Sequence, residues 1–322
     1  MTEFGPELEA VAPGVRRLRL PIPFPMRWVN VYVLGDGATP TLVDAGYPVP
    51  EARSLLLEAL HRAGLRPEIL LVTHAHPDHF GLAAELAGEL GCEVWMESRE
   101  LEAAQSYQPA SSTWGLLAAQ FEQGGMPPDR VEDVIRTGQH TWAVTPPPRV
   151  SRFVRADEEL ELGGRRWRVL VTPGHAPAHV CLFDPDSQTL LAGDHLLPRI
   201  TPNIGLWPTG SEDPLDDFLR SLAALRPLPV RRVLPGHGDP YDTFQGRVQE
   251  LLDHHRQRLQ AILQTLRGGP RTAYGVCTAL FGDGLDSHNV RFAMVETLSH
   301  LAYLERRGRL QRGEDGLYRA SH

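Results

Sequence analysis

The sequence contains no lysine, because all 32 of its basic residues are arginine. Catalysis through a Schiff-base lysine is therefore excluded. Cysteine is also scarce, with only Cys92, Cys181 and Cys277, which lie far apart along the chain. Three widely spaced cysteines form neither a disulfide framework nor a local CxxC metal site. We interpret them as buried thiols in a reducing compartment.

Long apolar runs are missing as well. No stretch of about 18 apolar residues is present, so no membrane-spanning segment is expected. The first ten residues, MTEFGPELEA, are acidic and lack the apolar core of a signal peptide. The formal net charge of −8 gives no general attraction to nucleic acids or anionic membranes. These features predict a cytoplasmic protein without membrane association.

The first half of the chain alternates β-rich and helical stretches. Residues 15–20, 28–34 and 40–46 predict strands, and residues 49–65 have the leucine and alanine spacing of a helix. The continuous apolar run at 68–74 is typical of a strand that is buried on both faces. A further helix and strand follow by residue 96. This β-α-β-α-β order predicts an α/β sandwich.

Two regions depart from this pattern. Residues 98–142 form a predicted helical insertion, after which strands resume up to the apolar run at 230–235. Residues 246–322 then read as three helices and two short strands, which resembles a winged-helix module. We therefore predict a catalytic domain at 1–245 and a small winged-helix-like domain at 246–322.

The stretch LLVTHAHPDHFG, residues 70–81, concentrates histidine and aspartate where a predicted strand ends. Zinc takes imidazole and carboxylate ligands, and a turn after a rigid strand can aim several of them at one point. His74 and His76 are placed to share one ion, and Asp78 and His79 to serve a neighbouring one. The stretch therefore predicts a metal-binding loop.

One loop cannot complete two metal sites, and three later motifs supply further ligands. TPGH ends on His175, AGDH contains Asp194, and PGHG contains His237, each after an apolar run. Glycines beside these residues let the backbone turn sharply at the strand ends.

In this order, TLVDAG, THAHPDH, TPGH, AGDH and PGHG resemble the ordered motif set of the metallo-β-lactamase superfamily. The resemblance covers roughly residues 15–245. It implies a four-layer αβ/βα sandwich with a two-metal site along one edge. The implied cofactors are two divalent metal ions, zinc first, with iron or manganese as alternatives.

The resemblance also implies a ligand assignment. His74, His76 and His175 would bind the first metal. Asp78, His79 and His237 would bind the second, and Asp194 would bridge the pair. Asp44 would steady the loop without binding metal itself.

The implied chemistry is hydrolysis by a metal-bound hydroxide, since metal binding lowers the pKa of water towards about 7. Asp78 would orient the hydroxide or pass a proton, and it is the predicted catalytic residue. His76 in place of a glutamate disfavours the flavodiiron reductases. Asp194 together with His79 resembles the glyoxalase II, lactonase and phosphodiesterase branches rather than the β-lactamases proper. We expect a hydrolase of a small ester, thioester or lactone.

Two other functions remain open. A metallo-β-lactamase domain with a winged-helix-like tail resembles a branch that includes endoribonucleases, and residues 246–322 hold 11 arginines against 8 acidic residues. However, the predicted helix at 287–308 carries only Arg291 before its basic end. We therefore favour a role for this tail in shaping the pocket or a homodimer interface over nucleic-acid binding. A mononuclear iron oxidoreductase, such as a persulfide dioxygenase, shares much of the same ligand set.

The insertion and the remaining histidines have open roles. The insertion either covers the site as a lid or only packs on the sandwich. As a lid, its aromatic residues together with Trp207 would favour a partly apolar acyl or ring substrate. Some histidines are candidates for lining the pocket or supporting the ligands: His140, His179 and His195. Others are expected to be solvated or interfacial on the C-terminal helices: His254, His255, His288 and His300.

Overall fold

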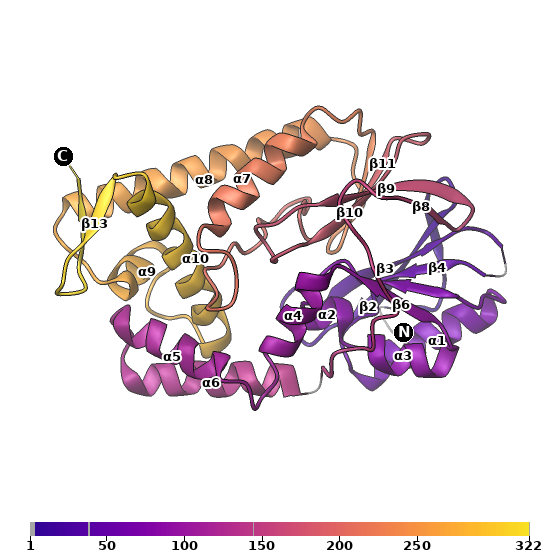
Figure 1. Cartoon of the computed structure of the whole chain (residues 1–322), viewed down its shortest axis with the longest axis horizontal. Coiled ribbons are helices and arrows are strands. Elements are labelled where there is room, and N and C mark those ends of the chain that lie inside the picture. Colours follow the sequence, from indigo (N-terminus) through magenta and orange to yellow (C-terminus); the bar gives the residue numbers. More distant parts are fainter. Residues whose placement is uncertain (1–3, 38, 144, 322) are drawn as a thin grey trace.

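The computed structural model describes residues 4–37, 39–143 and 145–321. Figure 1 shows two halves side by side, with two large sheets and their flanking helices in one half and a group of helices in the other. Within the described ranges, no helix is long and apolar enough to cross a membrane.

The first sheet has seven strands arranged in the order in which they occur along the chain. β1 to β4 pair antiparallel, and β4 to β7 pair parallel. The parallel part is built by crossovers through α1 (Pro50–Arg62) and through α2 (Pro77–Phe80) with α3 (Ala83–Leu90). The strands are β1 (Glu9–Ala12), β2 (Val15–Pro21), β3 (Trp28–Leu34), β4 (Thr41–Val43), β5 (Ile69–Leu71), β6 (Glu93–Met96) and β7 (Arg152–Phe153).

The second sheet has five strands in the order β12-β11-β10-β9-β8. Only the β11–β12 pair is parallel, and its crossover contains α7 (Pro214–Leu225). The strands are β8 (Glu159–Leu162), β9 (Arg165–Val171), β10 (Val180–Asp184), β11 (Thr189–Gly193) and β12 (Arg232–Pro235).

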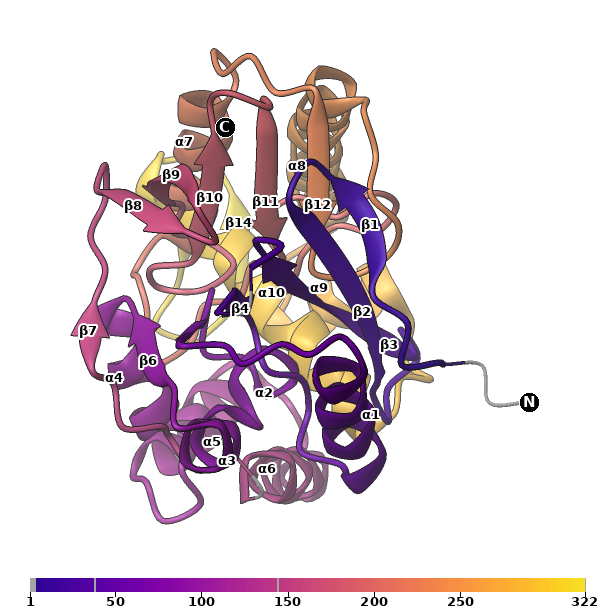
Figure 2. The same ribbon diagram turned by 90° about the vertical axis from the view of Figure 1, so that its right-hand side faces the viewer.

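Three buried hydrophobic clusters define the layers. One lies between the two sheets, where Tyr32 and Leu71 of the first sheet meet Trp167 and Leu182 of the second. Another packs α1 and α3 on the outer face of the first sheet, and the third packs α7 and α8 (Phe244–Arg267) on the outer face of the second. Figure 2 shows these layers from the side. The predicted four-layer αβ/βα sandwich is confirmed.

The insertion predicted at residues 98–142 is helical. It contains α4 (Ser98–Ser106), α5 (Thr113–Gln123) and α6 (Pro128–Ala143). α6 begins with proline in its first turn, where a missing N–H has no cost. It buries Val131, Val134 and Trp142 at helical spacing.

The C-terminal region contains the second part of α8, then α9 (Ala273–Phe281), α10 (Ser287–Arg306) and an antiparallel pair, β13 (Leu310–Arg312) and β14 (Tyr318–Ala320). The boundary predicted between residues 245 and 246 falls in the first turn of α8. Phe244 and Val248 belong to the core beneath the second sheet, whereas Ile262 packs with the C-terminal helices. The exact domain boundary and the winged-helix class stay predictions.

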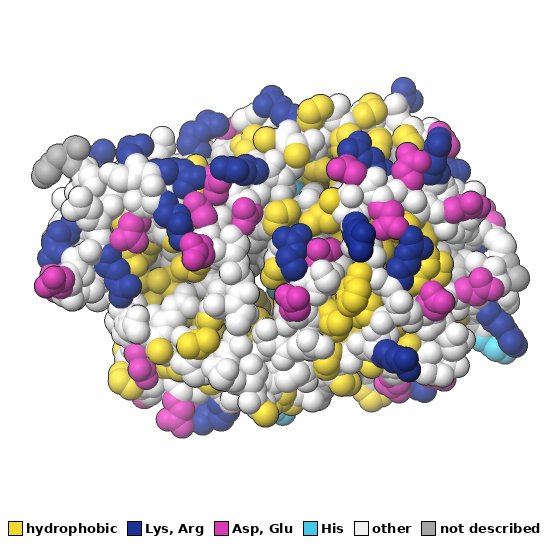
Figure 3. Space-filling view, viewed as in Figure 1, with side chains coloured by type: hydrophobic (Ala, Val, Ile, Leu, Met, Phe, Trp, Pro, Cys, Tyr) yellow, Lys and Arg dark blue, Asp and Glu magenta, His cyan; other side chains and the backbone are white. Residues whose placement is uncertain are grey.

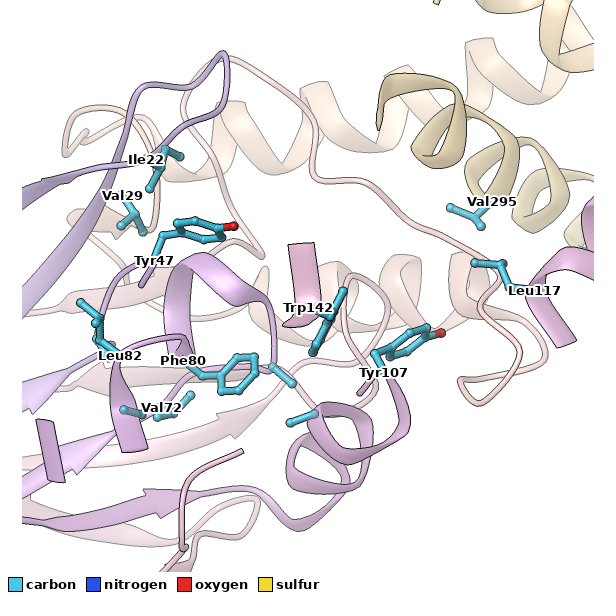
Figure 4. Packing of buried hydrophobic residues seen from close by; sticks show 14 of the residues in the cluster. Ile22, Val29, Tyr47, Val72, Phe80, Leu82, Tyr107, Leu117, Trp142 and Val295 are labelled. Atoms are coloured by element: carbon cyan, nitrogen blue, oxygen red, sulfur yellow. The ribbon is translucent and has the colours of Figure 1, made fainter. Parts of the chain in front are cut away.

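One continuous core joins the sandwich to both helical regions. The same cluster includes Phe80 beside the first sheet, Trp142 and Leu117 of the insertion, and Val295 of α10. Figure 4 shows Phe80, Trp142 and Tyr107 in succession between the sheet and the helices. The ring centroids are 5.8 Å apart for Phe80 and Trp142, and 5.2 Å apart for Trp142 and Tyr107. The helices are therefore part of one folded body with the sandwich.

Candidate metal centre

The ends of several strands bring the predicted ligands to one edge of the sandwich. The loop after β5 carries His74 and His76, and the short helix α2 that follows it carries Asp78 and His79. The other three ligands come from the second sheet: His175 after β9, Asp194 after β11 and His237 after β12. All of them except His76 are buried, and His76 is only partly exposed.

The structure brings all seven predicted residues together. Their possible ligand atoms form three overlapping groups, each within 4.8 Å: His74 with His76 and His175, His74 with His79 and Asp194, and Asp78 with His79 and His237. The Asp194 carboxylate lies between the first and the third of these groups. Its oxygens are 3.3 Å from Nε2 of His79, 3.7 Å from Nε2 of His175 and 3.4 Å from Nε2 of His237.

Three of these imidazoles are oriented by hydrogen bonds on their outer nitrogen. Nδ1 of His79 lies 2.7 Å from a carboxylate oxygen of Asp44, and Nδ1 of His175 and His237 lie 2.9 and 2.8 Å from backbone carbonyls. Because these partners are acceptors, each Nδ1 carries a proton, and Nε2 is the ring nitrogen that faces the centre and would bind a metal once it is deprotonated.

Within the described part of the chain, the inward-facing atoms have only one another as polar neighbours and form no hydrogen bond of good geometry. Nε2 of His79, His175 and His237 and Oδ1 of Asp194 are buried without a hydrogen bond among the described residues. In addition, Nε2 of His74 lies 3.0 Å from Nδ1 of His76, so two ring nitrogens converge. Converging buried acceptors are costly unless a cation satisfies them. This set of imidazole and carboxylate groups fits divalent metal ions such as zinc.

Without a metal, the negative carboxylates change the pKa values of the histidines beside them. Burial alone would lower the pKa of His237, but the carboxylates of Asp194 and Asp78 raise it to about 10. In the same way, burial would lower the pKa of His79, but Asp194 and Asp44 raise it well above its ordinary value. In contrast, burial and neighbouring imidazoles hold the pKa of His74 well below its ordinary value. The metal-free site therefore holds protons where cations would bind.

Asp44 steadies the first loop, as the sequence motif implied. One of its oxygens accepts the backbone N–H of Thr73 at 2.8 Å, and the other accepts the Thr73 hydroxyl and Nδ1 of His79. Its backbone has a φ of 64°, a left-handed conformation that non-glycine residues adopt rarely. A strained backbone held by three hydrogen bonds is typical of a functional site.

Gly236 is required by close packing behind the centre. A Cβ atom at this position would lie 2.2 Å from Oδ1 of Asp194 and 2.8 Å from Cε1 of His79. The glycine before His237 therefore leaves room for two other candidate ligands as well as turning the chain.

Sequence reasoning missed Glu100, which lies on the buried face of α4. Its side chain is 0% exposed, and its two oxygens accept the backbone N–H groups of Ala75 at 2.8 Å and Ala178 at 2.5 Å. Ala75 stands between His74 and His76, and Ala178 lies in the His175 loop. Glu100 therefore ties together two ligand loops from different sheets.

The three undecided histidines have different surroundings. Nε2 of His179 accepts the backbone N–H of Asp194 at 3.1 Å, so this residue supports the bridging position. His195 is buried against Phe218, with ring centroids 4.9 Å apart. His140 is exposed on α6 and is not among the described residues that line the cavity beside the centre.

A cavity of about 330 Å³ opens beside the candidate ligands. His76, Asp78, His175 and Asp194 form part of its wall, so the polar centre is accessible from it. Aromatic residues from the insertion and from the loop after β11 form another part: Tyr107, Trp142 and Trp207. Tyr107 and Trp142 also belong to the buried core cluster, whereas Trp114 and Phe121 belong to that cluster and do not line the cavity. Two aromatic residues of the insertion thus serve both packing and the cavity, and two serve packing alone.

Comparison with known proteins places this geometry in a family. Residues 27–237 match the model of the metallo-beta-lactamase superfamily, and residues 259–321 match that of a metallo-beta-lactamase-like C-terminal domain. A probable metallo-hydrolase of Bacillus subtilis, YqjP, is 32% identical over 89% of this chain and 91% of its own length. The crystal structure of a metallo-beta-lactamase family protein from Thermus thermophilus, TTHA1429, has a TM-score of 0.86 and 36% identity, and the match covers 97% of this chain and all of that one.

A more distant relative has a named activity. The atrochrysone carboxyl ACP thioesterase of Aspergillus fumigatus is 24% identical over 81% of this chain and 68% of its own length. The family models, the similarity to a metallo-hydrolase and the clustered histidines and aspartates agree with one another. The chain belongs to the metallo-β-lactamase superfamily and is a metallo-hydrolase.

Proposed function

We propose that this protein is a binuclear metal-dependent hydrolase of a small thioester, ester or lactone. The observation that carries the proposal is the position of Asp194, whose carboxylate lies between two sets of three ligands. His74, His76 and His175 would hold one divalent ion, and Asp78, His79 and His237 the other. The ligand set has no thiolate, which suits zinc and also permits iron or manganese.

A bound metal pair supplies activated water at neutral pH and polarises the bond that is cleaved. The residues of the chain then position the reaction. One carboxylate oxygen of Asp78 lies 3.1 Å from Nε2 of His237, and Asp78 also lines the cavity. A carboxylate at this place can accept a proton from the attacking water and pass it to the leaving group.

The cavity supports a substrate with an apolar acyl part. Beyond the polar centre, its wall contains Tyr107, Trp142, Trp207 and several prolines. Such a wall favours acyl chains or rings through the burial of apolar surface. Among the three substrate types we place thioesters first, because a relative is named as an acyl-carrier-protein thioesterase.

The alternatives stay predictions. On the face in Figure 3, arginine and acidic side chains are interspersed, whereas a nucleic-acid-binding surface is typically a continuous basic patch. This arrangement favours a small-molecule substrate over an endoribonuclease. A single iron in an oxidoreductase, a homodimer and the cytoplasmic location are likewise predictions that only experiment decides.

The test is turnover of a thioester, a lactone, a phosphodiester and a short RNA by the purified protein, together with metal analysis. We expect two metals per chain and chelator-sensitive cleavage of the thioester or lactone. Asp78→Ala should lose this turnover, whereas His140→Ala, which changes an exposed histidine, should keep it. Cleavage of RNA alone, or full activity with a single iron, would contradict the proposal.

A further inference from the structure

One wall of the cavity comes from the C-terminal region. The first two turns of α10 contribute His288, Asn289, Arg291 and Phe292 to the wall that also contains Asp78 and His175. The His288 ring stacks on Phe24, with centroids 5.1 Å apart. The cavity therefore extends from the candidate metal centre to the side chains of α10.

Arg291 is buried in this wall without an ionic partner. Its side chain is 3% exposed, and its Nε has no hydrogen-bond acceptor. In the part of the chain that the structure describes, no carboxylate forms an ion pair with it. A buried guanidinium without a carboxylate or phosphate partner is rare, because removing its charge from water is costly.

The surroundings of Arg291 hold the side chain in place but do not neutralise its charge. The guanidinium carbon lies 4.8 Å from the ring centroid of Phe292 and 5.9 Å from that of Trp207. Gly138 of α6 leaves room for it, since a Cβ there would lie 2.9 Å from Nη1. Cation–π contacts stabilise the charge but do not accept its N–H groups. Burial lowers the pKa of Arg291 to about 10, so it is charged at neutral pH.

Arg291 lines the same cavity as the candidate metal centre. His288, three positions before it on α10, stands in this wall too, and Asp78 and His175 line the cavity at the centre. An extended molecule that lies in the cavity with one end at Asp78 is therefore able to face Arg291 with the other.

The surroundings of Arg291 favour one class of negatively charged group as its partner. Arg291 is the only arginine among the described residues that line the cavity, and the chain has no lysine. A planar guanidinium binds a carboxylate through two parallel hydrogen bonds. A phosphate monoester carries about −1.5 to −2 charges at neutral pH, more than one arginine neutralises in an apolar wall.

We propose that Arg291 binds a carboxylate at the far end of the substrate's acyl chain. The preferred substrate class is therefore the thioester or ester of a dicarboxylic acid, cleaved at one end and held by the other. This inference rests on the proposed hydrolase function and adds to it the charge and length of the acyl group.

The test compares two thioesters of the same short thiol, one with a glutaryl group and one with a pentanoyl group. The chains have equal length, and only the glutaryl group has a free carboxylate. We expect the wild type to hydrolyse the glutaryl thioester with at least tenfold higher kcat/KM. Arg291→Met should lose this preference, because kcat/KM falls at least tenfold more for the glutaryl than for the pentanoyl thioester. Arg256→Met, which removes an exposed arginine of α8, should leave both rates unchanged.

Two further measurements do not depend on turnover. Calorimetry should detect glutarate binding to the wild type that is at least tenfold weaker in Arg291→Met, with inorganic phosphate as the comparison anion. The melting temperature of Arg291→Met should equal or exceed that of the wild type, because an apolar side chain replaces an unpaired buried charge.

The outcomes separate this inference from the proposed function. No preference for the glutaryl thioester, a preference that survives in Arg291→Met, or binding of phosphate in place of glutarate would overturn the carboxylate site. Equal loss of both activities with a lower melting temperature would make Arg291 structural. If neither thioester is hydrolysed but glutarate binding still depends on Arg291, the proposed hydrolase function fails and the carboxylate site stands.

Discussion

The tie between the two ligand loops through Glu100 allows a quantitative prediction. Replacing it by alanine leaves the backbone N–H groups of Ala75 and Ala178 buried without an acceptor. Each such group costs about 1–3 kcal/mol, so Glu100→Ala should lower the free energy of unfolding by ~2–6 kcal/mol. The ligand loops also lose their common anchor, and we expect metal affinity to fall by about 10- to 100-fold, as for other residues that orient ligands.

The loss should depend on pH with a defined sign. Burial, opposed by the two N–H groups, raises the pKa of Glu100 from 4.5 to about 7 in the metal-free protein. Since the folded state binds this proton more tightly than the unfolded state, the contribution of Glu100 to stability is full below pH 4.5 and falls as the pH rises through 7. The fall amounts to ~3 kcal/mol. The cost of Glu100→Ala should therefore be largest near pH 5 and smaller at pH 8.

Urea unfolding of the metal-free wild type, Glu100→Ala and Glu100→Gln at pH 5 and pH 8 measures both effects. Glutamine keeps the shape of the side chain and one acceptor oxygen. Glu100→Gln should therefore lower the free energy of unfolding by about half as much as Glu100→Ala, and both variants should lose the pH dependence that Glu100 gives to stability. Equal denaturation midpoints for all three proteins, together with unchanged metal affinity, would refute the assigned role. A cost that grows with pH would mean that Glu100 is ionised in the folded protein.

Two other changes probe the centre directly. Gly236→Ala places a methyl group against Asp194 and His79 and should lower metal content and affinity at least tenfold. The control Gly246→Ala lies in open space on α8 and should slightly stabilise the protein. Equal metal content in both variants would contradict the packing argument. Because the pKa of His237 is about 10 and that of His79 is raised without metal, loading zinc at pH 7.5 should release about two protons, measured by calorimetry in buffers of different ionisation enthalpy. A release near zero would show that these imidazoles are already neutral.

The sheets and the candidate ligands were accessible to sequence reasoning because their signals are local. A buried parallel strand reads as an apolar run, and the residue types after it are visible in the same few positions. His74 and His237 each stand in such a context, although 163 positions separate them. The ordered motif set then indicated that these separate strand ends meet at one edge.

The supporting residues escaped because their partners are distant in sequence. Glu100 accepts hydrogen bonds from backbone N–H groups 25 and 78 positions away, and no pattern in the neighbouring sequence indicates those contacts. A weak signal existed, since Glu100 and Ala104 share one face of α4 and both are buried. A glutamate on an inward face needs hydrogen-bond partners, but the sequence does not say which ones. α6 falls within the helical insertion predicted at 98–142, and its buried Val131, Val134 and Trp142 recur at helical spacing.

The sequence placed the C-terminal region in a separate domain and favoured a role for it in shaping the pocket or a homodimer interface. This region was set apart as a tail, yet α8 runs without a break from the core under the second sheet into it, and Val295 shares a core with Phe80 of the sandwich. Helix α10 also completes the cavity with His288 and Arg291. The sandwich edge brings the candidate metal ligands together, while the insertion and α10 surround the space where an acyl group would lie. Under the proposed function, substrate selection would therefore depend on helices outside the sandwich, because residues of the insertion and of α10 line the cavity beside the candidate ligands.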